Sequence, residues 1–235
     1  MNQPIDQQNT GIIKTIVSEQ ALKVLRNAYM LLALSMIPTI IGAYIGVANA
    51  DILMAAIMNS PIMSLVVYIA LVFGLLFAIH KTANSAAAIP LMLAFTFVLG
   101  VALGPLLTVA LLIGDGPALI AYAAGTTALI FFGLASYVTA TGKDFSGWGK
   151  FLFVGLIVLI IALIANLFFQ IPAFSLAISG AFVLLMSMFI LYDVSRIVHG
   201  GETNYILAAV SLYLNIYILF THLLNIMIVL TGGRD

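Results

Sequence analysis

The most polar stretch of this very apolar chain covers residues 193–202. Asp193, Arg196, His199 and Glu202 fall within ten positions, directly after a long apolar run. Two interpretations of Asp193 are open. It forms a local ion pair with Arg196 near a helix end, where the helix dipole also favours basic side chains. Alternatively, it is a functional carboxylate, because an unpaired acid inside a membrane is costly.

A second polar pattern lies inside the next apolar run. Ser211, Asn215, His222 and Asn225 recur at positions that share one stripe of a helix. Polar atoms that face lipid lack hydrogen-bond partners, so this stripe is expected to face protein or water. It either lines a path for ions or protons, or forms hydrogen bonds to a neighbouring helix at a central packing position.

The patterns of common catalytic and metal sites are missing from the sequence. The chain contains no HExxH, no GxSxG, no Walker loop and no cysteine, and its three histidines show no ligand spacing. A formal net charge of zero argues against nucleic acid as a partner, because phosphate binding requires a surplus of Lys and Arg. The sequence therefore predicts a protein without catalytic residues, metal or cofactor.

The elements that carry these residues are predicted to be membrane helices. Apolar residues make up 64% of the 235 residues and the mean hydropathy is +1.24, whereas soluble domains are roughly 45–50% apolar. A helix crosses the hydrocarbon core in about 20 residues, and seven such runs are present. They cover residues 28–47, 62–79, 86–113, 118–138, 151–169, 174–195 and 205–230. The predicted fold is an all-α integral membrane protein with seven transmembrane helices.

Basic residues predict the orientation of these helices, since Lys and Arg in short loops favour the cytoplasmic side. If each of the seven apolar runs crosses the membrane, seven of the eight Lys and Arg residues lie on the same side of it. These are Lys14, Lys23, Arg26, Lys81, Lys143, Lys150 and Arg196, and the eighth is Arg234. We therefore expect a cytoplasmic N-terminus and an external, periplasmic C-terminus.

The chain divides into a cytoplasmic N-terminal segment, residues 1–27, and a membrane domain, residues 28–235. Residues 1–11 are polar and are predicted to be disordered. From Ile12 to Ala28, apolar residues recur near helical spacing with Lys and Glu between them, which is typical of an amphipathic helix at a membrane surface. A helical extension of the first span explains the same pattern equally well.

Two spans carry Gly-x-x-x-Gly patterns, which let helix backbones approach closely. The first span contains Gly42 and Gly46, and the third contains Gly100 and Gly104. The third span is also longer than a membrane crossing requires, and Pro105 follows in its second half. We expect close helix packing at both glycine patterns and a kink or break near Pro105.

Several segments together resemble the Bax inhibitor-1 family of seven-span membrane proteins, in particular its bacterial YccA-like branch. They are KVLRNAY at 23–29, HKTANS at 80–85, AFTFVLGVALGPLL at 94–107, ANLFFQIPA at 165–173 and HGGETNYILAAVSLYLNIYILF at 199–220. The resemblance implies a bundle with the seventh helix at its centre, surrounded by the other six, in a bacterial inner membrane. It also implies two rival functions. Members of the wider family resemble pH-sensitive calcium leak pathways, whereas the YccA-like branch resembles partners that restrain the membrane AAA protease FtsH.

The resemblance also implies roles for the polar residues. In the wider family, two aspartates on the sixth and seventh spans share a proton, pair with a basic residue and close the leak. The first aspartate falls on Asp193 and the second on Asn215, with Arg196 or Lys81 as the cation. An Asp beside an Asn lacks the repulsion between two carboxylates, and the amide can donate to a fixed carboxylate. We therefore expect an FtsH modulator, with a calcium or cation leak as the alternative.

The expected partners are membrane lipid and an FtsH-type protease that takes hold of residues 1–11, with calcium as a partner on the leak alternative. The candidate polar latch or ion path consists of Asp193, Asn215, Arg196, Lys81, Ser211 and His222. Counted from the joint at residues 200–201, Asp193 and Asn215 differ in depth by roughly 10 Å at 1.5 Å per residue. Direct contact therefore requires a late start of the last helix, a tilt or a bridging water.

Overall fold

The computed structural model describes residues 5–169 and 171–232, which form helices joined by short links. The helices are α1 (Ile5–Ala48), α2 (Ala50–Asn59), α3 (Pro61–Thr82), α4 (Ala88–Ala102), α5 (Gly104–Leu111), α6 (Gly116–Thr141), α7 (Gly149–Phe169), α8 (Pro172–Val198) and α9 (Tyr205–Gly232), with a 3₁₀ turn, η1 (Ser146–Trp148), before α7. Seven stretches of the described chain are long and apolar enough to cross a membrane, and each overlaps its predicted range. The prediction of an all-α membrane protein with seven spans is confirmed.

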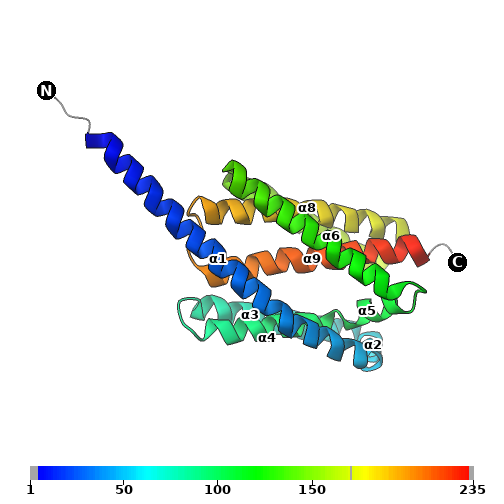
Figure 1. The fold of residues 1–235 in the computed structure, drawn as a ribbon. Coiled ribbons are helices and arrows are strands. Elements are labelled where there is room, and N and C mark those ends of the chain that lie inside the picture. The colour runs from blue at the N-terminus through cyan, green and yellow to red at the C-terminus, as the bar shows by residue number, and fades with distance from the viewer. Residues whose placement is uncertain (1–4, 170, 233–235) are drawn as a thin grey trace.

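Helix α9 lies at the centre of the bundle (Figure 1). Within the described chain, no residue from Tyr205 to Val229 is exposed. Helix α9 packs against α1, α4, α5, α6 and α8, whereas α3 packs mainly on α4, and α7 mainly on α8. Both outer helices leave most of their side chains exposed, which suits helices that face lipid. The central position of the seventh span is confirmed, although the other six do not surround it evenly.

Helices α1 and α4 approach each other backbone to backbone at the two glycine patterns. A Cβ added at Gly42 or Gly46 would clash with backbone atoms of α4, and one at Gly100 would clash with the backbone of Thr39. A Cβ at Gly104 would clash with the backbone of Gly46. Only glycine permits this separation of the two helices, so the predicted close packing is confirmed.

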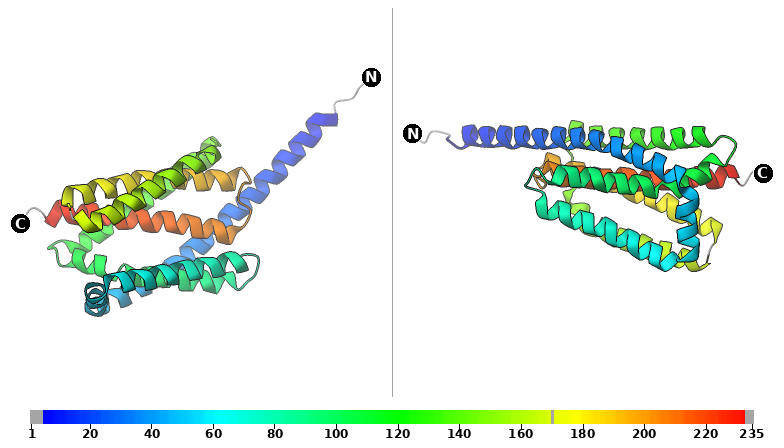
Figure 2. Two further views of the ribbon diagram at one scale, coloured as in Figure 1. Left: turned by 180° about the vertical axis from the view of Figure 1, so that it is seen from behind. Right: turned by 90° about the horizontal axis from the view of Figure 1, so that it is seen from below.

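The third span is broken where the sequence predicts, and a further short helix is present that the sequence did not predict. Helix α4 ends at Ala102, and α5 begins at Gly104 with Pro105 in its first turn, because proline cannot donate the N–H bond that a continuous helix needs. The additional helix, α2, has 10 residues and runs across one end of the bundle, between the end of α1 and the start of α3 (Figure 2). It is too short to cross a membrane.

The N-terminal segment differs from the prediction, because α1 is one continuous helix from Ile5. Disorder over residues 1–11 is therefore wrong for residues 5–11, and residues 1–4 lie outside the described chain. Helix α1 contains no proline before Pro38, and a single Gly11 weakens a helix without ending it. The continuity fits a helical extension of the first span, while the division of the chain at residue 28 stays a prediction.

Candidate functional site

Asp193 of α8 and Asn215 of α9 form a buried pair. Asn215 Nδ2 donates a hydrogen bond to Asp193 Oδ2 at 2.7 Å, and the two residues are only 9% and 6% exposed. The amide thus supplies a partner to a carboxylate that burial would otherwise leave unsatisfied. The contact is direct because α9 starts late. Residues 199–204 separate Val198 at the end of α8 from Tyr205, which removes part of the expected depth difference.

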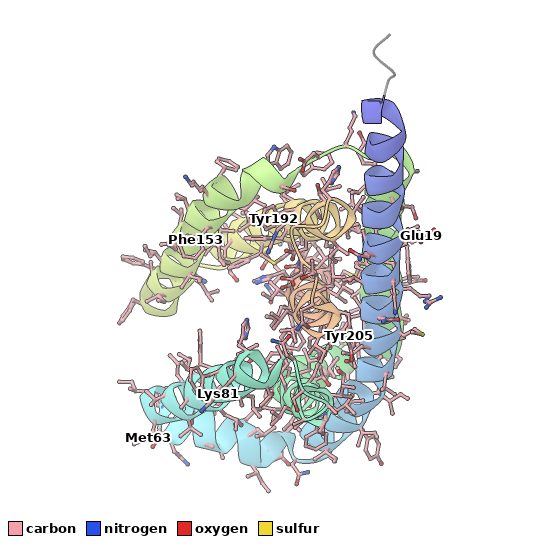
Figure 3. The ribbon with its side chains drawn as sticks, turned by 90° about the vertical axis from the view of Figure 1, so that its left-hand side faces the viewer. Glu19, Met63, Lys81, Phe153, Tyr192 and Tyr205 are labelled. Atoms are coloured by element: carbon pink, nitrogen blue, oxygen red, sulfur yellow. The ribbon has the colours of Figure 1, made fainter. Side chains whose placement is uncertain are left out.

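Neither of the two expected cations binds Asp193. Arg196 Nη2 lies 3.6 Å from Glu202 Oε2 and donates to the Gly201 carbonyl at 3.3 Å. Its side chain reaches past the helix end to the link, whereas Asp193 faces α9. Lys81 is exposed on α3, apart from α8 (Figure 3). Among the described residues, no ion pair reaches the Asp193 carboxylate, so the expected pairing with Arg196 or Lys81 is wrong.

Two further residues of the polar stripe on α9, His222 and Asn225, also face α8. His222 Nδ1 lies 3.2 Å from the Ser179 hydroxyl, and Asn225 Nδ2 donates to the same oxygen at 2.9 Å. The His222 ring stacks on Phe182, with ring centroids 4.2 Å apart. Ser211 is half-buried on the same helix. The contacts of His222 and Asn225 fit interhelical hydrogen bonding better than a path for ions, because both side chains contact the Ser179 hydroxyl of α8.

Two segments that carry the family resemblance, HKTANS and HGGETNY, meet where α9 begins. Asn204 Oδ1 accepts from the N–H groups of Ile206 and Leu207, at 2.9 and 3.3 Å, and so caps the first turn of α9. Its Nδ2 donates to the Ala83 carbonyl at 2.9 Å and to Asn84 Oδ1 at 3.1 Å. One side chain therefore fixes the start of α9 and holds it against the link between α3 and α4.

A loop anchor that the sequence did not predict joins the link between α6 and α7 to the end of α8. The Ser195 hydroxyl donates to Asp144 Oδ1 at 3.1 Å, and His199 Nε2 lies 3.1 Å from the Gly142 carbonyl oxygen. Hydrogen bonds from the side chain and backbone N–H of Ser146 lower the pKa of Asp144. The loop anchor has no signal in the spacing of the sequence, because 51 residues separate Asp144 from Ser195.

The chemistry available at this site is limited. Asp193 is a single buried carboxylate that accepts a hydrogen bond from an amide, and such a pair can fasten two helices. In the described part of the chain, no group of three or more His, Asp or Glu side chains is placed to hold a metal ion. The arrangement is therefore suited to holding α8 against α9.

Comparison with known proteins places the chain in a family. The family model described as "Inhibitor of apoptosis-promoting Bax1" matches residues 21–232. The modulator of FtsH protease YccA of Escherichia coli K12 is 44% identical over 87% of this chain and 89% of its own. A membrane protein of Vibrio cholerae is 40% identical over 97% of each chain, and a protein of Pseudomonas aeruginosa is 42% identical over 90% of this chain and 91% of its own.

These matches bear on the membrane in which the protein lies and on the family to which the chain belongs. The seven apolar helices, together with similarity to a protein named inner membrane protein YccA in another E. coli strain, support a multi-pass inner-membrane protein. The family match covers all seven spans, including the segments that meet at Asn204 and the helices that carry Asp193 and Asn215. The chain belongs to the Bax inhibitor-1 family.

Proposed function

We propose that this protein modulates an FtsH-type membrane AAA protease as a non-enzymatic interaction protein. The observation that carries the proposal is the 44% identity over 87% of the chain to a protein named modulator of FtsH protease. The outer helices α3 and α7 provide a suitable surface, because they are exposed along most of their length. Helices of a partner can pack against such a surface within the membrane.

The proposed orientation places the N-terminus in the cytoplasm and the end of α9 in the periplasm, following the distribution of Lys and Arg. The N-terminal part of α1 projects beyond the bundle (Figure 1). With this orientation it lies on the side where ATP is available to the protease, and residues 1–11 serve as its handle. A reporter fused at Lys143 is then expected to behave as cytoplasmic, and one after Gly232 as external. Matching signals would contradict seven spans.

The polar latch, defined as Asp193 with Asn215, is proposed to keep α8 against the central helix. The 2.7 Å hydrogen bond and the burial of both residues support this role. Ser211 and His222 extend the same face of α9, and Arg196 places positive charge at the end of α8. Lys81 contributes charge to that end of the bundle from α3 rather than to the latch itself.

The alternative, a pH-sensitive calcium or cation leak, requires a proton-sensitive closure. The resemblance assigns that closure to two carboxylates, but position 215 carries an amide that already donates to Asp193. A fixed hydrogen bond of this kind does not depend on a shared proton. The sequence at position 215 therefore favours modulation over a leak.

The test combines both functions in one preparation of liposomes containing FtsH, a membrane substrate of the protease and increasing amounts of this protein. We expect slower degradation of the substrate and co-purification of the two proteins from detergent. Deleting residues 1–11 is expected to lengthen the lifetime of this protein in cells with active protease, while membrane insertion stays unchanged. Unchanged substrate degradation, combined with calcium flux in the same liposomes, would support the leak instead.

A further inference from the structure

A groove of about 610 Å³ opens on the side of the bundle between α1 and α6, with α9 as its floor. Helices α1 and α6 lie in one layer over α9 (Figure 2). The wall on α1 extends from Tyr29 to Ala43, and the floor includes Tyr217 and Phe220. The lining is almost entirely apolar, and the volume is typical of ligand sites, which measure about 300–1,000 Å³.

The groove is long, and its apolar lining suits a hydrocarbon chain. From Tyr29 to Ala43, α1 rises by roughly 21 Å at 1.5 Å per residue. An acyl chain of a lipid can therefore lie along the groove between α1 and α6, in contact with the apolar side chains that line it.

The polar groups along the groove are bonded to protein, except for one at its end. The Thr39 and Tyr213 hydroxyls pair at 2.8 Å, and the Tyr217 hydroxyl donates to the Leu99 carbonyl at 3.1 Å. The Tyr29 hydroxyl is buried and has no hydrogen-bond partner among the described residues. Unsatisfied buried groups are rare because they cost free energy, so this end of the groove lacks an acceptor.

Arg26 continues the wall of the groove by one turn of α1. Residues 26, 29, 33, 36, 40 and 43 follow the spacing of one helix face, and all of them except Arg26 line the groove. Arg26 is exposed, and no charged residue follows it before Asp51. This position corresponds to the level of lipid headgroups, where a basic side chain attracts anionic lipid.

We propose that the groove binds an anionic phospholipid of the cytoplasmic leaflet, in the orientation given above. One acyl chain lies over Tyr217 and Phe220, and the phosphate contacts Arg26. An ester carbonyl accepts the hydrogen bond of the Tyr29 hydroxyl, and because that oxygen is buried, the side chains around it must shift when the lipid binds. The bound chain joins α1 to α6, which pack on α9 but make little direct contact with each other.

The test is native mass spectrometry of the detergent-purified protein with phosphatidylglycerol as the anionic probe and phosphatidylcholine as the zwitterionic one. We expect one retained phosphatidylglycerol and about fivefold weaker retention of phosphatidylcholine. Ala128→Trp fills the groove and is expected to reduce retention more than tenfold. Ala121→Trp is the matched control, because Ala121 is exposed on the same helix outside the groove.

Two further variants test the polar contacts separately. Arg26→Gln is expected to lower phosphatidylglycerol retention to that of phosphatidylcholine. Tyr29→Phe is expected to weaken retention about fivefold, and it raises the unfolding temperature of lipid-free protein because it removes an unsatisfied hydroxyl. A structural role of Tyr29 alone would not produce this opposite pair of effects.

Equal retention by folded Ala128→Trp and Ala121→Trp would overturn the groove as the binding site. Equal retention of both lipids by the unmodified protein would overturn the anionic preference. If Ala128→Trp fails to fold, as judged by size exclusion and circular dichroism, the smaller Ala128→Leu is measured in its place, with at least threefold weaker retention expected. Unchanged retention by Ala128→Leu would also overturn the proposal.

Discussion

Replacing Asn215 by Asp converts the polar latch into two facing carboxylates. Asn215 Nδ2 lies 2.7 Å from Asp193 Oδ2, so the new carboxylate stands directly beside the old one. Two unit charges about 4 Å apart repel by roughly 4 kcal/mol at an effective dielectric constant of about 20. The folded variant is therefore expected to keep one shared proton at neutral pH, and this proton replaces the lost amide donor.

The shared proton determines how the stability of Asn215→Asp depends on pH. Both carboxylates are ionised in the unfolded chain at neutral pH, so the folded variant binds one proton more than the unfolded one. Its free energy of unfolding then falls as pH rises, by up to about 1.4 kcal/mol per pH unit. For a chain of this size, that corresponds to roughly 3–6 °C in unfolding temperature per pH unit.

Thermal unfolding in detergent from about pH 5 to about pH 8, the range that contains neutral pH, measures this slope. We expect a steeper fall with pH for Asn215→Asp than for the unmodified protein. If the leak alternative holds, calcium flux through liposomes containing the variant becomes pH-dependent over the same range. Superimposable unfolding profiles would mean that positions 193 and 215 are not coupled.

The matched control is the exchange variant, Asp193→Asn with Asn215→Asp, which retains one carboxylate and one amide. Its profile is expected to return toward that of the unmodified protein, because the repulsion between two carboxylates is absent. A profile as steep as that of Asn215→Asp would assign the effect to burial of a carboxylate at position 215, and would contradict the shared proton.

Three further predictions concern packing, capping and the loop anchor. Gly104→Ala forces a Cβ against the backbone of α1 and should lower the free energy of unfolding by about 1–3 kcal/mol. Gly133 has open space around it, so Gly133→Ala should raise the free energy of unfolding by up to about 1 kcal/mol. Equal effects of the two substitutions would refute the close packing at Gly104. Asn204→Ala removes a cap and two bonds to the α3–α4 link, and we expect a loss of about 2–4 kcal/mol in denaturant unfolding. Hydrogen bonds from Ser146 lower the pKa of Asp144 below 3.8, so its contribution to stability is complete above that value and is lost as pH falls through the lower folded value. Asp144→Asn should therefore reduce the loss of stability that thermal unfolding shows as pH falls into the acid range. The same loss in the variant and the unmodified protein would contradict a role of Asp144.

The spans could be predicted because the bilayer imposes a length on every apolar run. The helix break at Pro105 and the close contact at the four glycines could also be predicted from the sequence, since proline and glycine have direct effects on the backbone at any position. Helix α2 could not be predicted, because ten mostly apolar residues between two spans fit a link as well as a helix. Disorder was predicted for residues 5–11 from their polar composition alone, but these residues belong to the same continuous helix as the first span.

The site was predictable in its residue types more than in its contacts. Helical spacing placed Asn215 on a buried stripe, but its depth relative to Asp193 depends on the link and on helix inclination, which spacing does not determine. Arg196 pairs with Glu202 because the chain turns back at Gly200, whose φ of 76° favours glycine. Such a turn brings together groups that sequence distance alone cannot pair correctly.

The central position of α9 has a consequence for biosynthesis. Helix α9 follows all the other described helices in the chain, yet it lies at the centre of the bundle. The ribosome delivers the N-terminal part first, so Asp193 and Thr39 enter the membrane before Asn215 and Tyr213, their partners on α9, have been made. A chain arrested before Tyr205 is therefore expected to be degraded much faster than the full sequence in a pulse-chase experiment. Membrane proteases thus have a period during translation when every copy is incompletely assembled, and the period closes only when α9 enters the bundle.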